Sequence, residues 1–176
     1  KVNKDVYKRY QTDEEVLRCA KILNKYKDKL NVMYDVITTN PYENAEDVIN
    51  LIKLLQKLPK PYYLSVNNLV FFTGTELYNK AKEDGIIKKE EDSAAMLNYW
   101  DRYKHIKLKK KNMYYNLVLN LMRGSVTEKR FGIMPNFLVN ILLKNGFSKG
   151  ANKKLLTFLM GNFVQVEDVV RENVLK

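Results

Sequence analysis

The pattern of apolar and polar positions changes near the middle of the chain. In the first 87 residues, apolar side chains recur every three or four positions in three stretches, which is typical of amphipathic helices. These stretches predict helices at about residues 12–27, 44–58 and 76–84. Thr12 and Glu15 have the spacing of a capping box at the start of the first helix. Asn44 can cap the second helix, with Asp47 three positions on.

Two shorter stretches in the same part are rich in β-branched and aromatic residues. Residues 31–39 and 62–72 are too short for buried helices and predict strands. Because helices and strands alternate with short links, we expect parallel neighbouring strands joined by right-handed crossovers. Two strands alone leave unpaired edges and an apolar face. We therefore interpret residues 1–87 as part of an α/β domain whose other strands lie outside the given sequence.

Residues 88–176 have a different character. Residues 88–112 are charged and poorly periodic. Apolar helices are predicted at 113–122, 135–144 and 152–160, with a weaker one at 166–175. Pro135 is suited to a first helical turn, whereas Gly146 and Gly150 are expected to interrupt the pattern. This half is interpreted as a mainly helical extension.

The composition is that of a folded domain or a piece of one. The chain has 176 residues, of which 45% are apolar, enough to build a core. It contains no run of 18 or more apolar residues, so we expect no membrane span. Its charged start, Lys1-Val-Asn-Lys-Asp5, resembles the middle of a protein. We therefore interpret the chain as a piece of a longer one.

The single cysteine, Cys19, and the single histidine, His105, limit the chemistry of the chain. One thiol forms no internal disulfide, which favours a cytoplasmic location. A structural zinc site needs about four such ligands, and a cubane iron–sulfur cluster needs about three protein thiolates. The sequence has no Ser-His-Asp set, phosphate loop or convincingly spaced carboxylate pair. We expect no metal bound by this chain alone.

Two ordered stretches resemble the cobalamin-binding branch of the radical S-adenosylmethionine (SAM) enzymes. Tyr34-Asp-Val-Ile-Thr-Thr-Asn-Pro-Tyr-Glu-Asn-Ala-Glu-Asp47 is similar to the family's "yD-x-I-x-x-x-P-x-E-t-x-e-D" strand and loop. Leu69-Val-Phe-Phe-Thr-Gly-Thr-Glu-Leu-Tyr-Asn-Lys-Ala-Lys-Glu-Asp-Gly85 resembles "l-x-x-f-P-G-T-x-L-y-x-x-A-x-x-x-G". The upstream Arg9-Tyr-Gln-Thr-Asp-Glu-Glu fits "R-x-x-t-x-e". Together they cover about half of the chain; Thr73 departs from the pattern, since the family usually has proline there.

The resemblance implies a fragment of a partial radical SAM-type (β/α) barrel, residues 1–87, followed by the helical extension, 88–176. An intact parent would hold a [4Fe–4S] cluster and perhaps cobalamin, and would cleave SAM at the carboxyl ends of the barrel strands. The cluster cysteines and the cobalamin domain are absent from this sequence. We therefore expect this chain alone to be inactive and to pair with the missing amino-terminal part. Its open strand edges also predict self-association.

Six residues are candidates for contact with SAM: Thr38, Thr39, Asn40, Ser65, Asn67 and Arg9. The first three end the first predicted strand, where the family places the adenosine, although polar groups there also commonly begin a loop. Ser65 and Asn67 are expected to face the barrel interior, where buried polar groups need partners. The Arg9 guanidinium can bind a carboxylate such as that of SAM, or pair with a neighbouring acid.

Two carboxylates have structural interpretations beside functional ones. Asp35 lies within an apolar strand, so we expect it to be buried with a hydrogen-bond donor as its partner. Glu43 either orients the loop after the first strand or is an exposed loop residue.

A small basic nucleic-acid-binding module is the alternative function. The formal net charge is +11, and residues 102–111 form a basic cluster beside Tyr99, Trp100 and Tyr103. Aromatic side chains above a basic groove can stack bases. The same residues also fit a helical face that packs on the barrel beneath solvated lysines. Salt-dependent retention of RNA or DNA separates the two interpretations.

Overall fold

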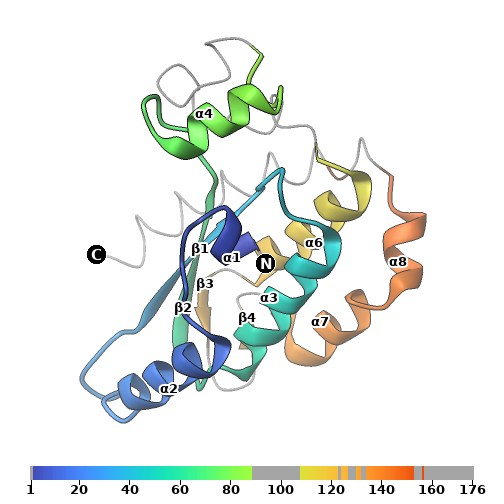
Figure 1. The fold of residues 1–176 in the computed structure, drawn as a ribbon. Helices are drawn as coiled ribbons and strands as arrows, with labels where there is room; N and C mark the ends of the chain where they lie inside the picture. The colour runs from blue at the N-terminus through green and yellow to red at the C-terminus, as the bar shows by residue number, and fades with distance from the viewer. Residues whose placement is uncertain are drawn as a thin grey trace, which may run out of the picture.

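The computed structural model describes residues 2–88, 108–122, 124–126, 130–131, 134–152 and 156, and Figure 1 shows their arrangement. The basic segment before residue 108, with Tyr99, Trp100, Tyr103 and His105, lies outside the described residues. So do the helix predicted at 166–175 and most of that predicted at 152–160. No helix in the described ranges is both long enough and apolar enough to cross a membrane.

The predicted pair of parallel strands is confirmed. β1 (Met33–Thr38) pairs in parallel with β2 (Tyr62–Asn68), and the register places Asp35 beside Ser65 and Thr38 beside Asn68. Helix α3 (Ala45–Lys57) connects the two strands and packs on one face of the sheet (Figure 1). The carboxyl ends of β1 and β2 therefore lie at the same edge of the sheet.

The second half of the chain contributes strands, which corrects two expectations: that the edges of the first two strands stay open and that Pro135 opens a helix. β3 (Gly124–Val126) pairs antiparallel with the edge of β2, giving the order β1-β2-β3. Strands β4 (Arg130–Phe131) and β5 (Met134–Pro135) form a second antiparallel pair, so Pro135 ends a strand instead of opening a helix. Part of the edge pairing of β2 thus comes from this chain itself. Strands of two or three residues carry no periodicity, so the apolar pattern could not reveal them.

Local capping chemistry determines where the helices of the first half begin. α2 (Asp13–Asn24) and α3 both begin with a complete capping box, built by Thr12 with Glu15 and by Asn44 with Asp47. In α4 (Glu76–Glu83), the Thr75 hydroxyl accepts a hydrogen bond from the amide of Tyr78. The short helix α1 (Val2–Asp5) precedes them.

Two glycines with positive φ flank α4. Gly74, in the turn before α4, has φ +88°, and Gly85, which follows α4, has φ +69°. Both values lie in the left-handed region that residues with a Cβ rarely adopt.

The helices of the second half differ from their predicted bounds. α6 (Lys110–Leu121) begins before the predicted Met113, and all nine residues from Asn112 to Asn120 are buried. α7 (Asn136–Leu142) is shorter than predicted, and α8 (Asn145–Gly150) forms where two glycines were expected to break the helix. Tertiary packing overrides the low helix propensity of glycine here. α3 and α6 lie against each other, and α8 packs on α6 (Figure 1).

The buried apolar side chains form two clusters. The larger cluster joins α3, β1, β2 and α6, and includes Ile52, Tyr62, Val66 and Leu119. The smaller cluster lies where β1 and β2 end, and its buried members are Leu69, Phe71, Tyr78, Ala81 and Ile87. The polar residues discussed next lie between these two cores.

Candidate functional site

The carboxyl end of β1 is a buried polar turn. Thr38, Thr39 and Asn40 are each no more than 2% exposed. The backbone of Thr38 continues the sheet, because its carbonyl accepts a hydrogen bond from the amide of Leu69 at 2.8 Å. The structure thus brings these three predicted residues together beneath other side chains, rather than in an open loop.

Thr39 adopts a backbone conformation that is rare for its residue type. Its φ is +57°, in the left-handed region, which is disfavoured for a β-branched side chain. Three hydrogen bonds hold it: its hydroxyl donates to the carbonyl of Thr38 and to Oδ1 of Asn68, and its amide donates to Oδ1 of Asn116. Such conformations persist where the surroundings over-determine them, often at functional sites.

Three asparagines of α6 form a ladder along the helix. Asn112, Asn116 and Asn120 are spaced by four residues and lie on one helix face. The Asn116 side chain donates to the carbonyl of Asn112, and the Asn120 side chain donates to the carbonyl of Asn116. Oδ1 of Asn116 also accepts a hydrogen bond from the hydroxyl of Thr38. Sequence reasoning missed this ladder, although the four-residue spacing was a readable signal.

The ladder joins the helical extension to the loop after β1. Asn112 donates to the backbone carbonyl of Glu43, so α6 contacts both the end of β1 and the start of the α3 connection. Because the polar atoms of Thr38 and Thr39 already bond to Asn116, they are engaged within the protein. These threonines therefore shape the strand end, and the groups open to a ligand lie elsewhere.

Glu43 and Tyr7 flank the same turn. Burial, with a smaller contribution from Asp47, raises the pKa of Glu43 to about 7. Burial, with the nearby Glu43 carboxylate, raises the pKa of Tyr7 as well. The Tyr7 hydroxyl accepts a hydrogen bond from the Asn40 amide at 3.0 Å. Glu43 is thus not the exposed loop residue of the second alternative: it is half-buried, and burial brings the pKa of its carboxyl group near neutral pH.

Ser65 and Asn67 lie on the same face of β2, where Ser65 is buried, at 4% exposure, and Asn67 is half-buried. The Asn67 amide donates to the Ser65 hydroxyl at 3.2 Å and to the Asp35 carboxylate at 3.3 Å. Asp35 therefore has the predicted donor partner, but it is exposed, which corrects the expectation of a buried carboxylate. Side chains alternate between the two faces of a strand, so the apolar neighbours of Asp35 in sequence did not reveal its exposure.

Arg9 lies beside the turn rather than within it. Its guanidinium carbon is 5.9 Å from the centre of the Tyr7 ring, a cation–π contact. Through Tyr7 and Asn40, Arg9 is connected to the end of β1. The six predicted residues thus divide into a buried group at the strand end, the bonded pair Ser65 and Asn67 on β2, and Arg9 at the margin.

No part of the described chain shows a metal centre. Among these residues, no group of three His, Cys, Asp or Glu side chains lies close enough to hold a metal ion. Cys19 is exposed on α2. A [4Fe–4S] cluster needs at least about three thiolates, so the residues present do not fit one.

Comparisons with known proteins add no further constraint on this site. Neither models of protein families, nor curated protein sequences, nor solved structures match this chain.

Proposed function

We propose that this chain is the carboxyl-terminal part of a cobalamin-binding-type radical SAM enzyme. In this proposal, the sheet edge formed by the ends of β1 and β2 contributes to SAM binding. The iron–sulfur cluster would belong to sequence outside this chain, and no reaction step is assigned to the residues described above.

The main support for the proposal is that the two stretches that resemble the radical SAM family contact each other. The first runs from β1 into the start of α3, and the second follows β2 and includes α4. The Tyr42 hydroxyl, from the first stretch, donates to the Asp84 carboxylate of the second at 2.8 Å. The ammonium group of Lys80 lies 5.3 Å from the centre of the Tyr42 ring. Segments about 40 residues apart therefore form one structural unit, as a shared family motif requires.

The same unit has a common apolar core. Tyr42 and Ile37 of the first stretch pack against the cluster built from Leu69, Phe71 and Tyr78 of the second. Tyr7, close to the third resembling stretch, joins this cluster. Packing of the two longer stretches at one sheet edge supports a common role for them at that edge.

Asp35 and Asn67 have groups suited to SAM. The Asp35 carboxylate, which is exposed, accepts hydrogen bonds, as from ribose hydroxyls or an amino group, and the half-buried Asn67 amide both donates and accepts. The Ser65 hydroxyl is buried and bonds to the Asn67 amide. We expect Asn67 and Asp35 to make the direct contacts. The Asn116-bound threonines would hold the turn in shape.

The coding sequence upstream of Lys1 tests the proposal first. A Cys-x-x-x-Cys-x-x-Cys motif in the same reading frame supports it, because three thiolates can anchor the cluster. A start codon at this position, with a stop codon just before it, would refute the proposal.

SAM binding by the complete encoded protein tests the site. We expect Asn67→Ala to weaken SAM binding by about tenfold, the effect of one lost hydrogen bond in a binding site. Asn79→Ala, which changes an exposed asparagine of α4, is the matched control and should bind SAM like the unchanged protein. Equal affinities of the two variants in isothermal titration calorimetry would remove Asn67 from the site.

A further inference from the structure

The positive charge of the chain is concentrated in its second half. Residues 108–152 contain eight basic residues and one acidic residue, Glu128. The remainder of the chain holds 23 basic and 19 acidic residues, so its charges nearly balance. This uneven distribution indicates an anionic partner for the surface formed by α6 and α8 more than a general enrichment in lysine.

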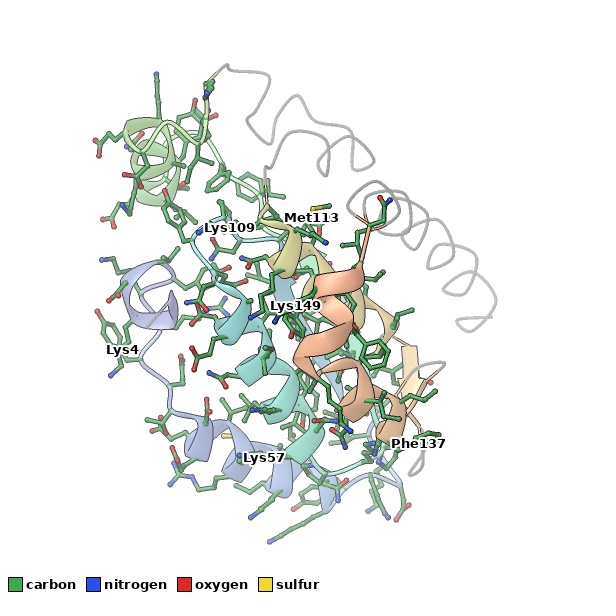
Figure 2. All side chains as sticks on the ribbon, turned by 90° about the vertical axis from the view of Figure 1, so that its right-hand side faces the viewer. Lys4, Lys57, Lys109, Met113, Phe137 and Lys149 are labelled. Atoms are coloured by element: carbon green, nitrogen blue, oxygen red, sulfur yellow. The ribbon has the colours of Figure 1, made fainter. Side chains whose placement is uncertain are left out.

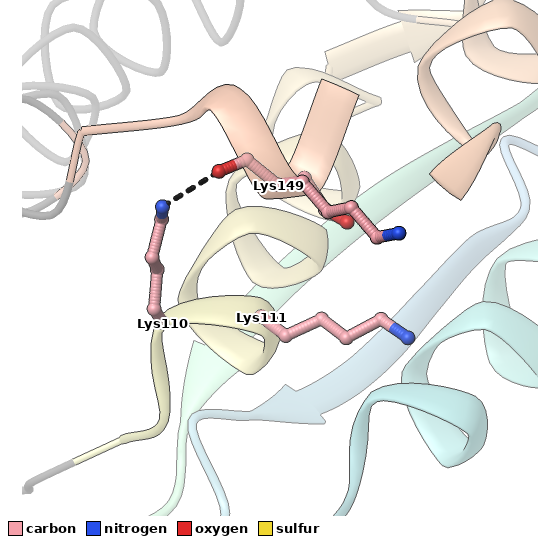
Figure 3. A pocket seen from close by; sticks show the side chains of 4 residues that line it. Lys110, Lys111 and Lys149 are labelled. Atoms are coloured by element: carbon pink, nitrogen blue, oxygen red, sulfur yellow. Dashed lines mark hydrogen bonds between the residues drawn. The ribbon is translucent and has the colours of Figure 1, made fainter. Parts of the chain in front are cut away.

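A cavity lies where α6 and α8 meet. Its volume is about 350 Å³, and the described residues that line it are Lys110, Lys111, Ser148 and Lys149. Figure 3 shows the side chains of Lys111 and Lys149 running in the same direction, one from each helix. Ser148 is buried, at 4% exposure. Figure 2 shows Lys109 at the start of α6 and Lys149 below it on α8.

One of the three lysines holds the cavity together. Nζ of Lys110 donates to the backbone carbonyl of Lys149 at 2.8 Å, which joins the first turn of α6 to the last turn of α8 (Figure 3). The Lys110 ammonium keeps its charge and two further N–H donors, and Lys111 and Lys149 add two more positive charges at the cavity. Lys110 is a positioning residue, because it acts through the placement of Lys149.

The charged residues among the described lining of this cavity are all lysines. Lys109, Lys110 and Lys111 follow one another at the start of α6, where the helix dipole is already positive. The first turn has no acidic residue, and Lys109 makes no side-chain capping bond. A bound anion would neutralise this cluster and satisfy the free amides of the first turn.

We propose that the cavity binds the phosphate group of a small phosphorylated molecule. Lysine ammonium groups bind phosphate as point charges, and Lys111 and Lys149 approach the cavity from two different elements. A volume of about 350 Å³ is at the lower end of the range for small-molecule sites. A recess of this size admits a phosphate or diphosphate group. This proposal does not depend on the proposed SAM site, because the two sites are built from different residues.

Pyrophosphate is the probe for this site. In isothermal titration calorimetry of the 176-residue chain at pH 7 and low salt, we expect one saturable site. The double variant Lys111→Ala/Lys149→Ala should weaken binding by about a hundredfold, since each charge-assisted contact contributes about tenfold. Lys144→Ala is the control, because Lys144 is also exposed in this half but does not line the cavity. It should change the affinity by less than about twofold.

Three results would overturn the proposal. The first is an absence of saturable pyrophosphate binding, and the second is a loss of affinity in Lys144→Ala as large as that in the double variant. The third is tight binding of a fluorescent single-stranded RNA that excess pyrophosphate does not displace. That result would mean that the basic surface binds nucleic acid and not a small phosphorylated molecule. Far-ultraviolet circular dichroism of each variant verifies the fold, and exposed lysines are expected to tolerate alanine.

Discussion

The hydrogen bonds between Asn116 of α6 and the end of β1 should contribute strongly to the stability of the fold. The substitution Asn116→Ala tests this. Oδ1 of Asn116 accepts hydrogen bonds from the amide of Thr39, at 3.1 Å, and from the hydroxyl of Thr38. Both threonines are almost completely buried, so water cannot replace the lost acceptor. The substitution also removes the donor to the carbonyl of Asn112. One buried group without a partner costs about 1–3 kcal/mol, and we expect a total loss of about 3 kcal/mol.

Asn120→Ala is the matched control for this substitution. Asn120 lies one turn further along the same helix face, and its amide donates to the carbonyl of Asn116 at 2.7 Å. Its Oδ1 is buried without a hydrogen-bond partner. Alanine therefore removes one bond and also one unsatisfied acceptor. We expect Asn120→Ala to destabilise the fold by about 1 kcal/mol, which is about 2 kcal/mol less than Asn116→Ala.

Urea unfolding followed by circular dichroism measures the difference. With a slope of about 2 kcal/mol per molar urea, the two variants should differ by about 1 M in their unfolding midpoints. Equal midpoints would show that the Asn116 bonds contribute no more than an ordinary buried amide. In that case the left-handed backbone of Thr39 would need another support.

Three further predictions concern groups of the α/β half. The pKa of Glu43 is about 7 in the folded protein, whereas its ordinary value is 4.5. Between these pH values the folded state keeps a proton that the unfolded state releases, so the stability of the fold decreases as the pH rises. Glu43→Gln should therefore raise the urea midpoint at pH 8 but not at pH 4; equal changes at both would contradict this. Asn44→Ala removes the acceptor of two α3 amides and should cost about 1 kcal/mol, seen as a melting temperature lower by about 2–4 °C; no change would mean that the cap is unimportant. Tyr62→Phe removes a 2.6 Å bond to the carbonyl of Leu55 and should cost about 1 kcal/mol in urea unfolding, an estimate that an unchanged midpoint would reject.

The α/β half was largely predictable because its signals are local. A capping box lies within four residues, and a strand of six or seven residues with several β-branched or aromatic side chains is evident in the sequence. The parallel pairing of β1 and β2 followed from the order of the elements. The alternation that set Ser65 and Asn67 on one sheet face was also visible, since side chains of a strand alternate with a period of two.

Non-local pairing was not predictable in the same way. Gly124, Ser125 and Val126 have no pattern of their own, and they form a strand because the edge of β2 offers unpaired backbone groups. Likewise, α8 includes Gly146 and Gly150 and is held against α6 by the bond from Lys110. In both cases the partner is distant in sequence, so no short window contains the cause.

The sequence alone determined the helix starts, the two parallel strands and the residue types at the carboxyl ends of those strands. Only the tertiary structure decided which of these residues are open and which are engaged. Thr38 and Thr39 bond to an asparagine almost 80 residues away, whereas Asp35 is exposed and accepts a hydrogen bond from the half-buried Asn67. The physical reason is that a polar side chain bonds whichever partner the packed helices bring within reach, and burial makes that bond obligatory.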